Sequence, residues 1–184
     1  MNLLTAEHIT KAYSERVLLD DVSLGIQEGE KIGVIGVNGM GKSTLLRILA
    51  GAEEPDEGTV IQGRNVKTGY LPQSPVFGEK DTVLEAVLAG DAGETPEGFA
   101  RESEARAMLN RLGLSDFSKP VAELSGGQKK RAALVRVLLN PADFLVLDEP
   151  TNHLDSEMSD WLENYLNRFR GTLLMVTHDR YFLD

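Results

Sequence analysis

One nine-residue segment, GVNGMGKST at residues 36–44, constrains the fold of this chain more than any other. It fits the pattern G-x-x-x-x-G-K-[ST] and lies between the mostly apolar run KIGVIG and a helical pattern that reaches about Ala50. A phosphate-binding loop requires this context of strand, turn and helix. The segment therefore predicts a nucleotide site, and the alternation of strands and helices along the chain predicts an α/β domain with a mostly parallel sheet. The alternative interpretation is a glycine-rich turn at a helix start.

The residue types in this loop suit a triphosphate. Glycines let successive backbone N–H groups point inward around a phosphate chain. Lys42 brings a positive charge to the β- and γ-phosphates, and Ser43 offers its hydroxyl to Mg²⁺. The predicted nucleotide-binding residues of the loop are Gly36, Asn38, Gly39, Met40, Gly41, Lys42, Ser43 and Thr44.

A second segment, FLVLDEP at residues 144–150, consists of four apolar residues followed by two acids and a proline. A buried strand here would place Asp148 and Glu149 at the carboxyl edge of the sheet, where ligands bind in α/β folds. We expect Asp148 to hold Mg²⁺ directly or through water, and Glu149 to polarise the attacking water. Two solvated acids at a strand end are the alternative.

Three single residues complete the predicted site. Gln73 follows a short strand that ends near Leu71, where it could touch the metal or the water. His178 ends the last predicted strand and can hydrogen-bond the γ-phosphate and hold the attacking water. Tyr13 lies in a loop after the first predicted strand and can stack on a purine ring. No N-K-x-D sequence that would read guanine occurs in the chain, so adenine is preferred.

The segment LSGGQKK at residues 124–130 precedes a helical pattern at residues 131–139. A helix that opens on Ser-Gly-Gly presents bare backbone N–H groups at its N-terminus, and such an end attracts an anion. A plain helix cap is the alternative. The densest basic cluster of the chain, at residues 129–131 and 136, is interpreted as a solvated helix face.

Composition excludes several classes of function. A formal net charge of −10 over 184 residues makes the chain a poor non-specific binder of nucleic acid, so no direct DNA partner is expected. The absence of cysteine excludes disulfides and thiolate metal sites. No apolar run approaches the length of a membrane span, and the first 17 residues do not resemble a secretory signal. We therefore predict a cytoplasmic chain with no membrane partner.

The remaining patterns predict how the chain is organised. Strands are expected at residues 3–9, 22–27, 59–62 and 172–177, and helices at residues 83–88, 99–112 and 156–169, with a loop at residues 91–98. We predict one nucleotide-binding domain. Its core would comprise residues 1–73 and 141–184, and a helical subdomain at residues 74–140 would carry LSGGQ.

The order of these motifs resembles the nucleotide-binding domain of ATP-binding cassette (ABC) proteins over nearly all of the chain. The resemblance implies the ABC cassette fold of P-loop NTPases, with a mostly parallel core sheet, an antiparallel β part and a short helical subdomain. It implies an ATPase that uses ATP and Mg²⁺. It also implies that LSGGQ acts in trans, in a head-to-tail pair of cassettes. The residues it assigns to the contact with the opposite ATP are Ser125, Gly126, Gly127 and Gln128, with Asp155 in the dimer-interface loop.

The segments EPTNHLD at residues 149–155 and THDRYFLD at residues 177–184 are similar to those of the ABC-F subfamily. That resemblance implies a cytosolic, two-cassette protein that acts on the ribosome, with this chain as its first cassette. The chain departs from the pattern because it contains no second cassette and no charged helical linker, and the stretch between Gln73 and Leu124 is short. We therefore expect a fragment whose isolated turnover is weak.

Two other functions stay open at this point. A subunit that couples ATP to a membrane transporter is one, although the NHLD sequence at residues 152–155 argues against it. A nucleotide-dependent interaction module with little turnover is the other, although Glu149, His178 and Gln73 argue against lost chemistry.

Overall fold

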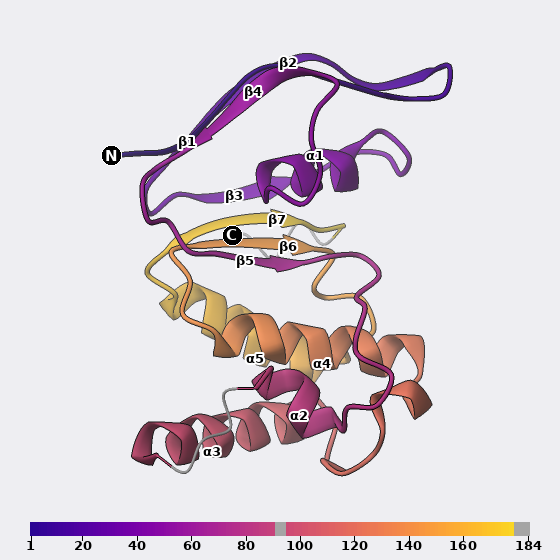
Figure 1. Ribbon diagram of the computed structural model, residues 1–184, viewed down its shortest axis with the longest axis vertical. Helices are drawn as coiled ribbons and strands as arrows, with labels where there is room; N and C mark the ends of the chain where they lie inside the picture. The colour runs from indigo at the N-terminus through magenta and orange to yellow at the C-terminus, as the bar shows by residue number, and fades with distance from the viewer. Residues whose placement is uncertain (91–94, 179–184) are drawn as a thin grey trace. The chain divides into compact units, whose positions relative to one another are not determined.

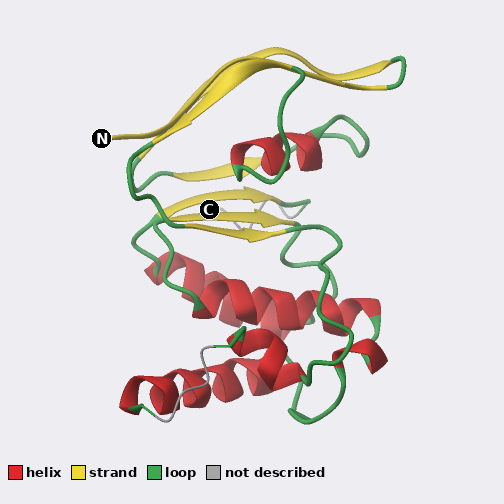
Figure 2. Cartoon of the chain, in the orientation of Figure 1, coloured by secondary structure: helices red, strands yellow, loops and turns green. Residues whose placement is uncertain are grey.

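The structure is a computed structural model that describes residues 1–90 and 95–178, and the chain falls into two compact units. The first unit consists of Met1–Pro72, Ala142–Glu149 and Arg170–Asp184. The second consists of Gln73–Pro141 and Pro150–Phe169. The first unit contains all the named strands, and the second contains helices joined by loops (Figure 2).

An antiparallel sheet of order β2-β1-β4 lies in the first unit. Its strands are β1 (Asn2–Tyr13), β2 (Arg16–Gln27) and β4 (Glu57–Gln62). The predicted strands at residues 3–9 and 22–27 are confirmed, but both extend toward a shared hairpin. The prediction that Tyr13 lies in a loop is wrong, because Tyr13 pairs with Arg16 and is the last residue of β1.

A parallel sheet of order β3-β7-β6-β5 forms the other sheet of the first unit. Its strands are β3 (Lys31–Val34), β5 (Thr68–Leu71), β6 (Phe144–Asp148) and β7 (Thr172–Val176). Every residue of β6 and β7 is buried. Central strands of a parallel sheet are covered on both faces, which explains their uninterrupted apolar sequences.

Helix α1 (Lys42–Leu49) lies between the two sheets of the first unit (Figure 1). One face of α1 is apolar, and Leu46, Ile48 and Leu49 are buried in a core cluster that both sheets share. Leu4 and Ile26 enter this cluster from the antiparallel sheet. The helix ends at the predicted place, since Ala50 is its C-cap and Gly51 follows with φ +77°. The helix that follows the phosphate-binding loop is therefore held in the core.

The second unit is helical. Helices α2 (Val83–Leu88), α3 (Pro96–Arg111) and α4 (Gly126–Leu139) pack against one another, and a 3₁₀ helix η1 (Val121–Glu123) precedes α4. Helix α5 (Ser156–Arg168) follows, and its Tyr165 hydroxyl donates to the Leu138 carbonyl of α4 at 3.0 Å.

The start of α3 corrects one prediction. A loop was expected through residue 98, but α3 begins at Pro96 because Thr95 caps it, with the Thr95 hydroxyl accepting from the Gly98 N–H at 3.1 Å. The part of that predicted loop at residues 91–94 lies outside the described residues.

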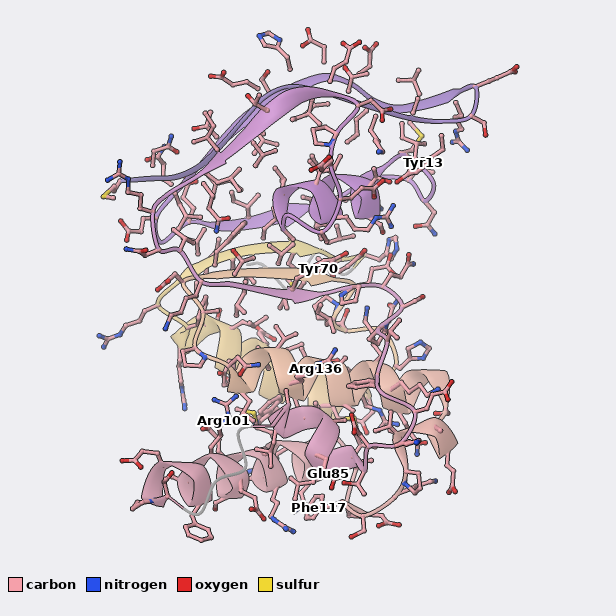
Figure 3. All side chains as sticks on the ribbon, in the orientation of Figure 1. Tyr13, Tyr70, Glu85, Arg101, Phe117 and Arg136 are labelled. Atoms are coloured by element: carbon pink, nitrogen blue, oxygen red, sulfur yellow. The ribbon has the colours of Figure 1, made fainter. Side chains whose placement is uncertain are left out.

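The basic cluster of α4 is not a solvated face, contrary to the prediction. Lys130 is 4% exposed, and its ammonium donates to the Gln73 carbonyl at 3.2 Å. Arg131 is half-buried, and the guanidinium of Arg136, a residue that Figure 3 labels, lies 4.3 Å from the centre of the Phe77 ring. Because α4 packs against α2 and α3, the aliphatic stems of these cations are covered and their charged ends contact other segments.

Candidate functional site

The glycine-rich loop at residues 36–41 joins β3 to α1, as predicted. Gly41 is the N-cap of α1 at φ +88°, and a Cβ atom there would lie 2.9 Å from the Leu18 carbonyl oxygen. Glycine is therefore required at this position both by the backbone conformation and by the space around it. The Lys42 ammonium reaches back across the loop and donates to the Gly36 carbonyl. The loop thus places a cation and the bare N-terminus of α1 together, which is an arrangement that binds phosphate.

Two hydroxyl residues follow Lys42 in the first turn of α1. Ser43 is half-buried, while Thr44 is 4% exposed and its hydroxyl accepts from Arg47 Nη2 at 3.2 Å. Thr44 is therefore less accessible to a ligand than Ser43. The Ser43 hydroxyl is the one suited to a metal ion.

The two predicted acids lie at the carboxyl ends of neighbouring parallel strands. Asp148 ends β6 opposite Val176 of β7, and its side chain is buried. Glu149 follows at φ +49°, a left-handed conformation that is uncommon for a side chain of this size, and its N–H donates to the Val176 carbonyl at 2.9 Å. This bond fixes the Glu149 backbone to β7.

His178 meets Glu149 at this edge. The His178 Nε2 atom lies 2.7 Å from Glu149 Oε1. Glu149 is 8% exposed as a residue, whereas the His178 side chain is 47% exposed. The register of β6 and β7 therefore brings together two of the three predicted catalytic residues, and it presents a carboxylate held by an imidazole at the rim of the sheet.

The oxygen donors of the first unit fit a magnesium ion. Ser43 supplies a hydroxyl, Asp148 supplies a buried carboxylate, and Mg²⁺ is usually held by one or two protein oxygens together with substrate phosphates and waters. Within residues 1–90 and 95–178, no cluster of three His, Cys, Asp or Glu side chains forms an all-protein metal cage. Gln73, the third residue expected near the metal, is exposed and belongs to the second unit.

Tyr13 has polar partners that its sequence position did not predict. Its hydroxyl donates to a Glu53 carboxylate oxygen and accepts from Arg47 Nη2 at 3.1 Å. The Lys11 ammonium lies 5.6 Å from the centre of its ring. The residue as a whole is 41% exposed, and Figure 3 shows it between the β1–β2 hairpin and α1.

The LSGGQ segment begins α4 with a capping box in the second unit. The Ser125 hydroxyl accepts from the Gln128 N–H at 3.2 Å, and the Gln128 side chain accepts from the Ser125 N–H at 3.0 Å. Ser125 and Gly126 are exposed, whereas a Cβ atom on Gly127 would lie 3.2 Å from the His153 side chain. Ser125 therefore does cap α4. The cap does not cover the backbone of the first turn at Gly126, which is exposed to a partner.

Asp155 also has a local structural role. It is the N-cap of α5, and its Oδ1 atom accepts from the Met158 N–H at 2.8 Å. A cap of this kind fixes the start of the helix and satisfies one of its free donors.

Sequence reasoning missed four residues that contact the predicted site. Arg16 donates to the Gly39 carbonyl of the phosphate-binding loop at 2.8 Å, Arg47 and Glu53 hold Tyr13, and Lys130 holds the Gln73 carbonyl. These are pairs that lie far apart in the sequence. The one available signal was the position of Arg47, a basic residue in the last turn of the helix that begins at Lys42.

Comparisons with known proteins agree on one family for this chain. The ABC transporter family matches residues 19–152. YfmR of Bacillus subtilis, an uncharacterized ABC transporter ATP-binding protein, is 41% identical over all of this chain and 35% of its own length. EttA of Escherichia coli K12, an energy-dependent translational throttle protein, is 39% identical over 92% of this chain and 37% of its own. The chain thus spans about a third of the length of these relatives.

A solved structure extends the likeness to three dimensions. The ATP-binding cassette MJ0796, in a dimeric post-hydrolysis state bound to ADP and Pi, is 28% identical and superimposes with a TM-score of 0.82 over 98% of this chain and 90% of its own. In the part of the chain that the structure describes, no helix is both long and apolar enough to cross a membrane.

Proposed function

We propose, from the premise that this chain belongs to the ABC transporter family and is therefore an ATP-binding ATPase domain, that it works as one half of a head-to-tail pair of cassettes. In this proposal the triphosphate lies on the loop from Gly36 to Thr44, with the adenine against Tyr13. The similar cassette MJ0796 supports the pairing, because its post-hydrolysis state with ADP and Pi is dimeric.

The observation that carries the hydrolytic assignment is the 2.7 Å contact between Glu149 and His178. We assign Glu149 as the group that polarises the attacking water, since a carboxylate accepts a proton within hydrogen-bond reach of its substrate. His178 holds that carboxylate and is exposed enough to meet the γ-phosphate. The fixed Glu149 backbone keeps the carboxylate oriented before substrate arrives.

Mg²⁺ would be held by the Ser43 hydroxyl and the Asp148 carboxylate, and Gln73 would touch it or the water. Held there, magnesium would supply positive charge to the phosphate oxygens of ATP during hydrolysis. Lys42 adds a second positive charge from the protein.

The partner in this proposal is a second cassette, either another copy of this chain or a second cassette of a longer protein. The exposed Ser125 side chain and the backbone N–H of Gly126, at the positive end of α4, would meet the γ-phosphate held by the opposite phosphate-binding loop. Gly127 and Gln128 complete this trans contact, and Asp155 would lie at the interface.

We further propose an ABC-F role, with the ribosome as the target in the full-length protein and the cytoplasm as its location. The support is the likeness to EttA, a translational throttle protein, together with the EPTNHLD and THDRYFLD segments.

Sedimentation velocity of the Glu149→Gln variant, with and without Mg-ATP, tests the pairing. We expect ATP to shift the chain from a monomer to a dimer. A chain that binds ATP but stays monomeric up to high protein concentration would contradict pairing of identical cassettes. Pelleting of the same variant with purified ribosomes in ATP tests the target, and a variant that binds ATP but stays out of the ribosome pellet would contradict it.

A further inference from the structure

The Tyr13 hydroxyl lies at the centre of a charged network that joins three segments of the first unit. It donates to Glu53 Oε1, in the loop between α1 and β4. Arg47 of α1 contacts both partners, with Nε donating to Glu53 Oε2 at 2.7 Å and Nη2 donating to the Tyr13 hydroxyl at 3.1 Å. The phenol is therefore held by an ion pair rather than by a single neutral hydrogen bond.

A second cation fastens the same loop to β1. The Lys11 ammonium lies 3.3 Å from Glu53 Oε1 and 3.3 Å from Asp56 Oδ1, and it also donates to the Glu54 carbonyl at 2.9 Å. The other oxygen of Asp56 accepts from the Ala12 N–H at 2.9 Å. The loop after α1 is thus attached to the strand that ends at Tyr13.

The network is partly shielded from water, with Lys11 and Glu53 the most covered of its charged members. The side chains of Lys11, Glu53 and Arg47 are 14%, 20% and 38% exposed. The hydrogen bond from Tyr13, followed by those from Arg47 and Lys11, lowers the pKa of Glu53, so its carboxylate is ionised at neutral pH and accepts these bonds. Tyr13 as a residue is 41% exposed, although its hydroxyl is held by Glu53 and Arg47.

The same helix carries the phosphate-binding residues. Arg47 lies in the last turn of α1, whose first residue is Lys42, and Arg47 also donates to the Thr44 hydroxyl. At the other side of the hairpin, Arg16 donates to the Gly39 carbonyl of the loop itself. Two contacts therefore fix the tip of the β1–β2 hairpin relative to the loop that holds the phosphates.

We infer that Glu53 and Arg47 are positioning residues for nucleotide recognition: they hold the Tyr13 ring at a set place relative to the phosphate-binding loop, so that one ligand meets both. This inference rests on the proposed adenine contact of Tyr13. Under this inference, recognition of the base depends on the loop between α1 and β4, which contains Glu53 and contacts neither the base nor the phosphates in the proposed complex. The competing explanation is that the network stabilises the fold and has no effect on the ring.

Isothermal titration with two ligands, Mg-ATP and Mg-tripolyphosphate, separates these explanations, because the second ligand has no base. We expect Tyr13→Phe and Glu53→Gln each to weaken ATP binding about 3- to 10-fold, which is the size of one net hydrogen bond, and to leave tripolyphosphate within about 2-fold of the parent. Arg47→Met should behave like Glu53→Gln. The double variant Tyr13→Phe/Glu53→Gln should lose no more ATP affinity than the single variant with the larger loss, since both changes act on the same contact between phenol and carboxylate.

Asp21→Asn is the matched control. It weakens an exposed 2.6 Å contact between His8 of β1 and Asp21 of β2, in the hairpin that contains Tyr13, and neither residue is a predicted site residue. This variant should bind both ligands like the parent. If Asp21→Asn weakens ATP binding as much as Glu53→Gln does, any change in the hairpin lowers the affinity, and the positioning role of Glu53 is wrong.

Tyr13→Ala distinguishes failure of the inference from failure of the adenine contact. If Tyr13→Ala weakens ATP binding while Tyr13→Phe and Glu53→Gln bind ATP normally, the Tyr13 ring contributes to binding but the network does not position the ring. If Tyr13→Ala also binds ATP normally, the proposed adenine contact fails and the positioning role fails with it. Equal weakening of ATP and tripolyphosphate in Glu53→Gln would assign the network to the phosphate-binding loop, and that result also overturns the inference.

Discussion

Glu149 and His178 meet at the ends of β6 and β7, with 2.7 Å between Oε1 and Nε2, although 29 residues separate them in the sequence. Their strands pair in parallel with Asp148 opposite Val176, so residues just beyond each strand end lie at one edge. The carboxylate is nearly buried and the imidazole is half exposed. A carboxylate with this single orientation is suited to a water that attacks from one direction.

Glu149→Gln should lower ATP turnover by at least about 100-fold while ATP affinity stays within about 2-fold of the parent. The amide retains the size of the side chain and can still hydrogen-bond His178, but it cannot accept a proton from water. Phosphate release and equilibrium binding measure the two effects. Equal turnover in the two proteins would move the catalytic role to another group, His178 first.

His178→Ala tests whether the imidazole acts through Glu149. If its role is to hold the carboxylate, turnover falls in the single variant, and adding His178→Ala to Glu149→Gln causes little further loss. Losses that multiply in the double variant would show that His178 acts independently of Glu149.

Local sequence patterns predicted much of this site. The phosphate-binding loop, the strand that ends at Asp148, and the capped helix after Ser125 all depend on residues within a few positions of one another. Hydrophobic periodicity and turn chemistry determine such features. The sequence also placed Glu149 and His178 at the ends of predicted strands. Parallel strands in α/β folds have their carboxyl ends at one edge of the sheet, so the two residues lie at the same edge.

The contacts that were missed depend on tertiary packing. Lys130 looked like part of a solvated face because charge alone does not show which side of a helix is covered, yet it is buried and reaches Gln73. Tyr13 was predicted to lie in a loop because the apolar pattern of the first strand ends before Tyr13, although the strand itself continues to that residue. Its partners Arg47 and Glu53 lie 34 and 40 residues away, so no local pattern could identify them.

Lys42→Ala should remove most ATP binding. The ammonium supplies a charge-assisted contact to phosphate in a partly dry loop, and losing such a contact costs about 1.5–3 kcal/mol, or roughly 10- to 100-fold in affinity. Arg64→Ala is the charge-matched control, because Arg64 is exposed in the turn between β4 and β5. Titration with a fluorescent ATP analogue measures both. Similar affinities in the two variants would contradict the phosphate assignment.

The stability that Glu53 contributes should be present at neutral pH and lost in acid. Hydrogen bonds from Tyr13, Arg47 and Lys11 lower the pKa of Glu53 below 4.5, its ordinary value. The unfolded chain therefore binds a proton at Glu53 before the folded chain does. Stability falls as the pH drops from about 4.5 through the lower folded pKa.

Urea unfolding of the parent and of Glu53→Gln, from pH 7 to pH 3, measures this contribution. The difference in unfolding free energy should be constant above about pH 5.5 and should shrink below pH 4.5. A difference that is the same at pH 7 and pH 3 would show that the Glu53 charge does not stabilise the fold.

Gly126 and Gly127 lie in the same turn of α4 but in different surroundings. A Cβ atom on Gly126 would have no neighbour within 4 Å, whereas one on Gly127 would lie 3.2 Å from the Cβ and Cγ atoms of His153. Gly126→Ala should therefore stabilise the chain by up to about 0.5–1 kcal/mol, since alanine is the better helix former. Gly127→Ala should lose that gain because His153 must move. Chemical unfolding of the two variants measures the difference, and equal stabilisation would mean that His153 moves without cost.

Gly126→Asp separates the cap of α4 from its proposed contact with a second cassette. An acidic residue in the first turn interacts favourably with the helix dipole, so this variant should fold as stably as the parent, and it should bind ATP normally because Gly126 lies outside the phosphate-binding loop. A γ-phosphate on the opposite cassette would nevertheless meet a like charge. Parent turnover should rise with the square of protein concentration, and Gly126→Asp should abolish that dependence. If the segment is a helix cap alone, Gly126→Asp keeps the parent's turnover per chain at every concentration. Strictly first-order turnover in the parent would contradict the paired arrangement for this chain.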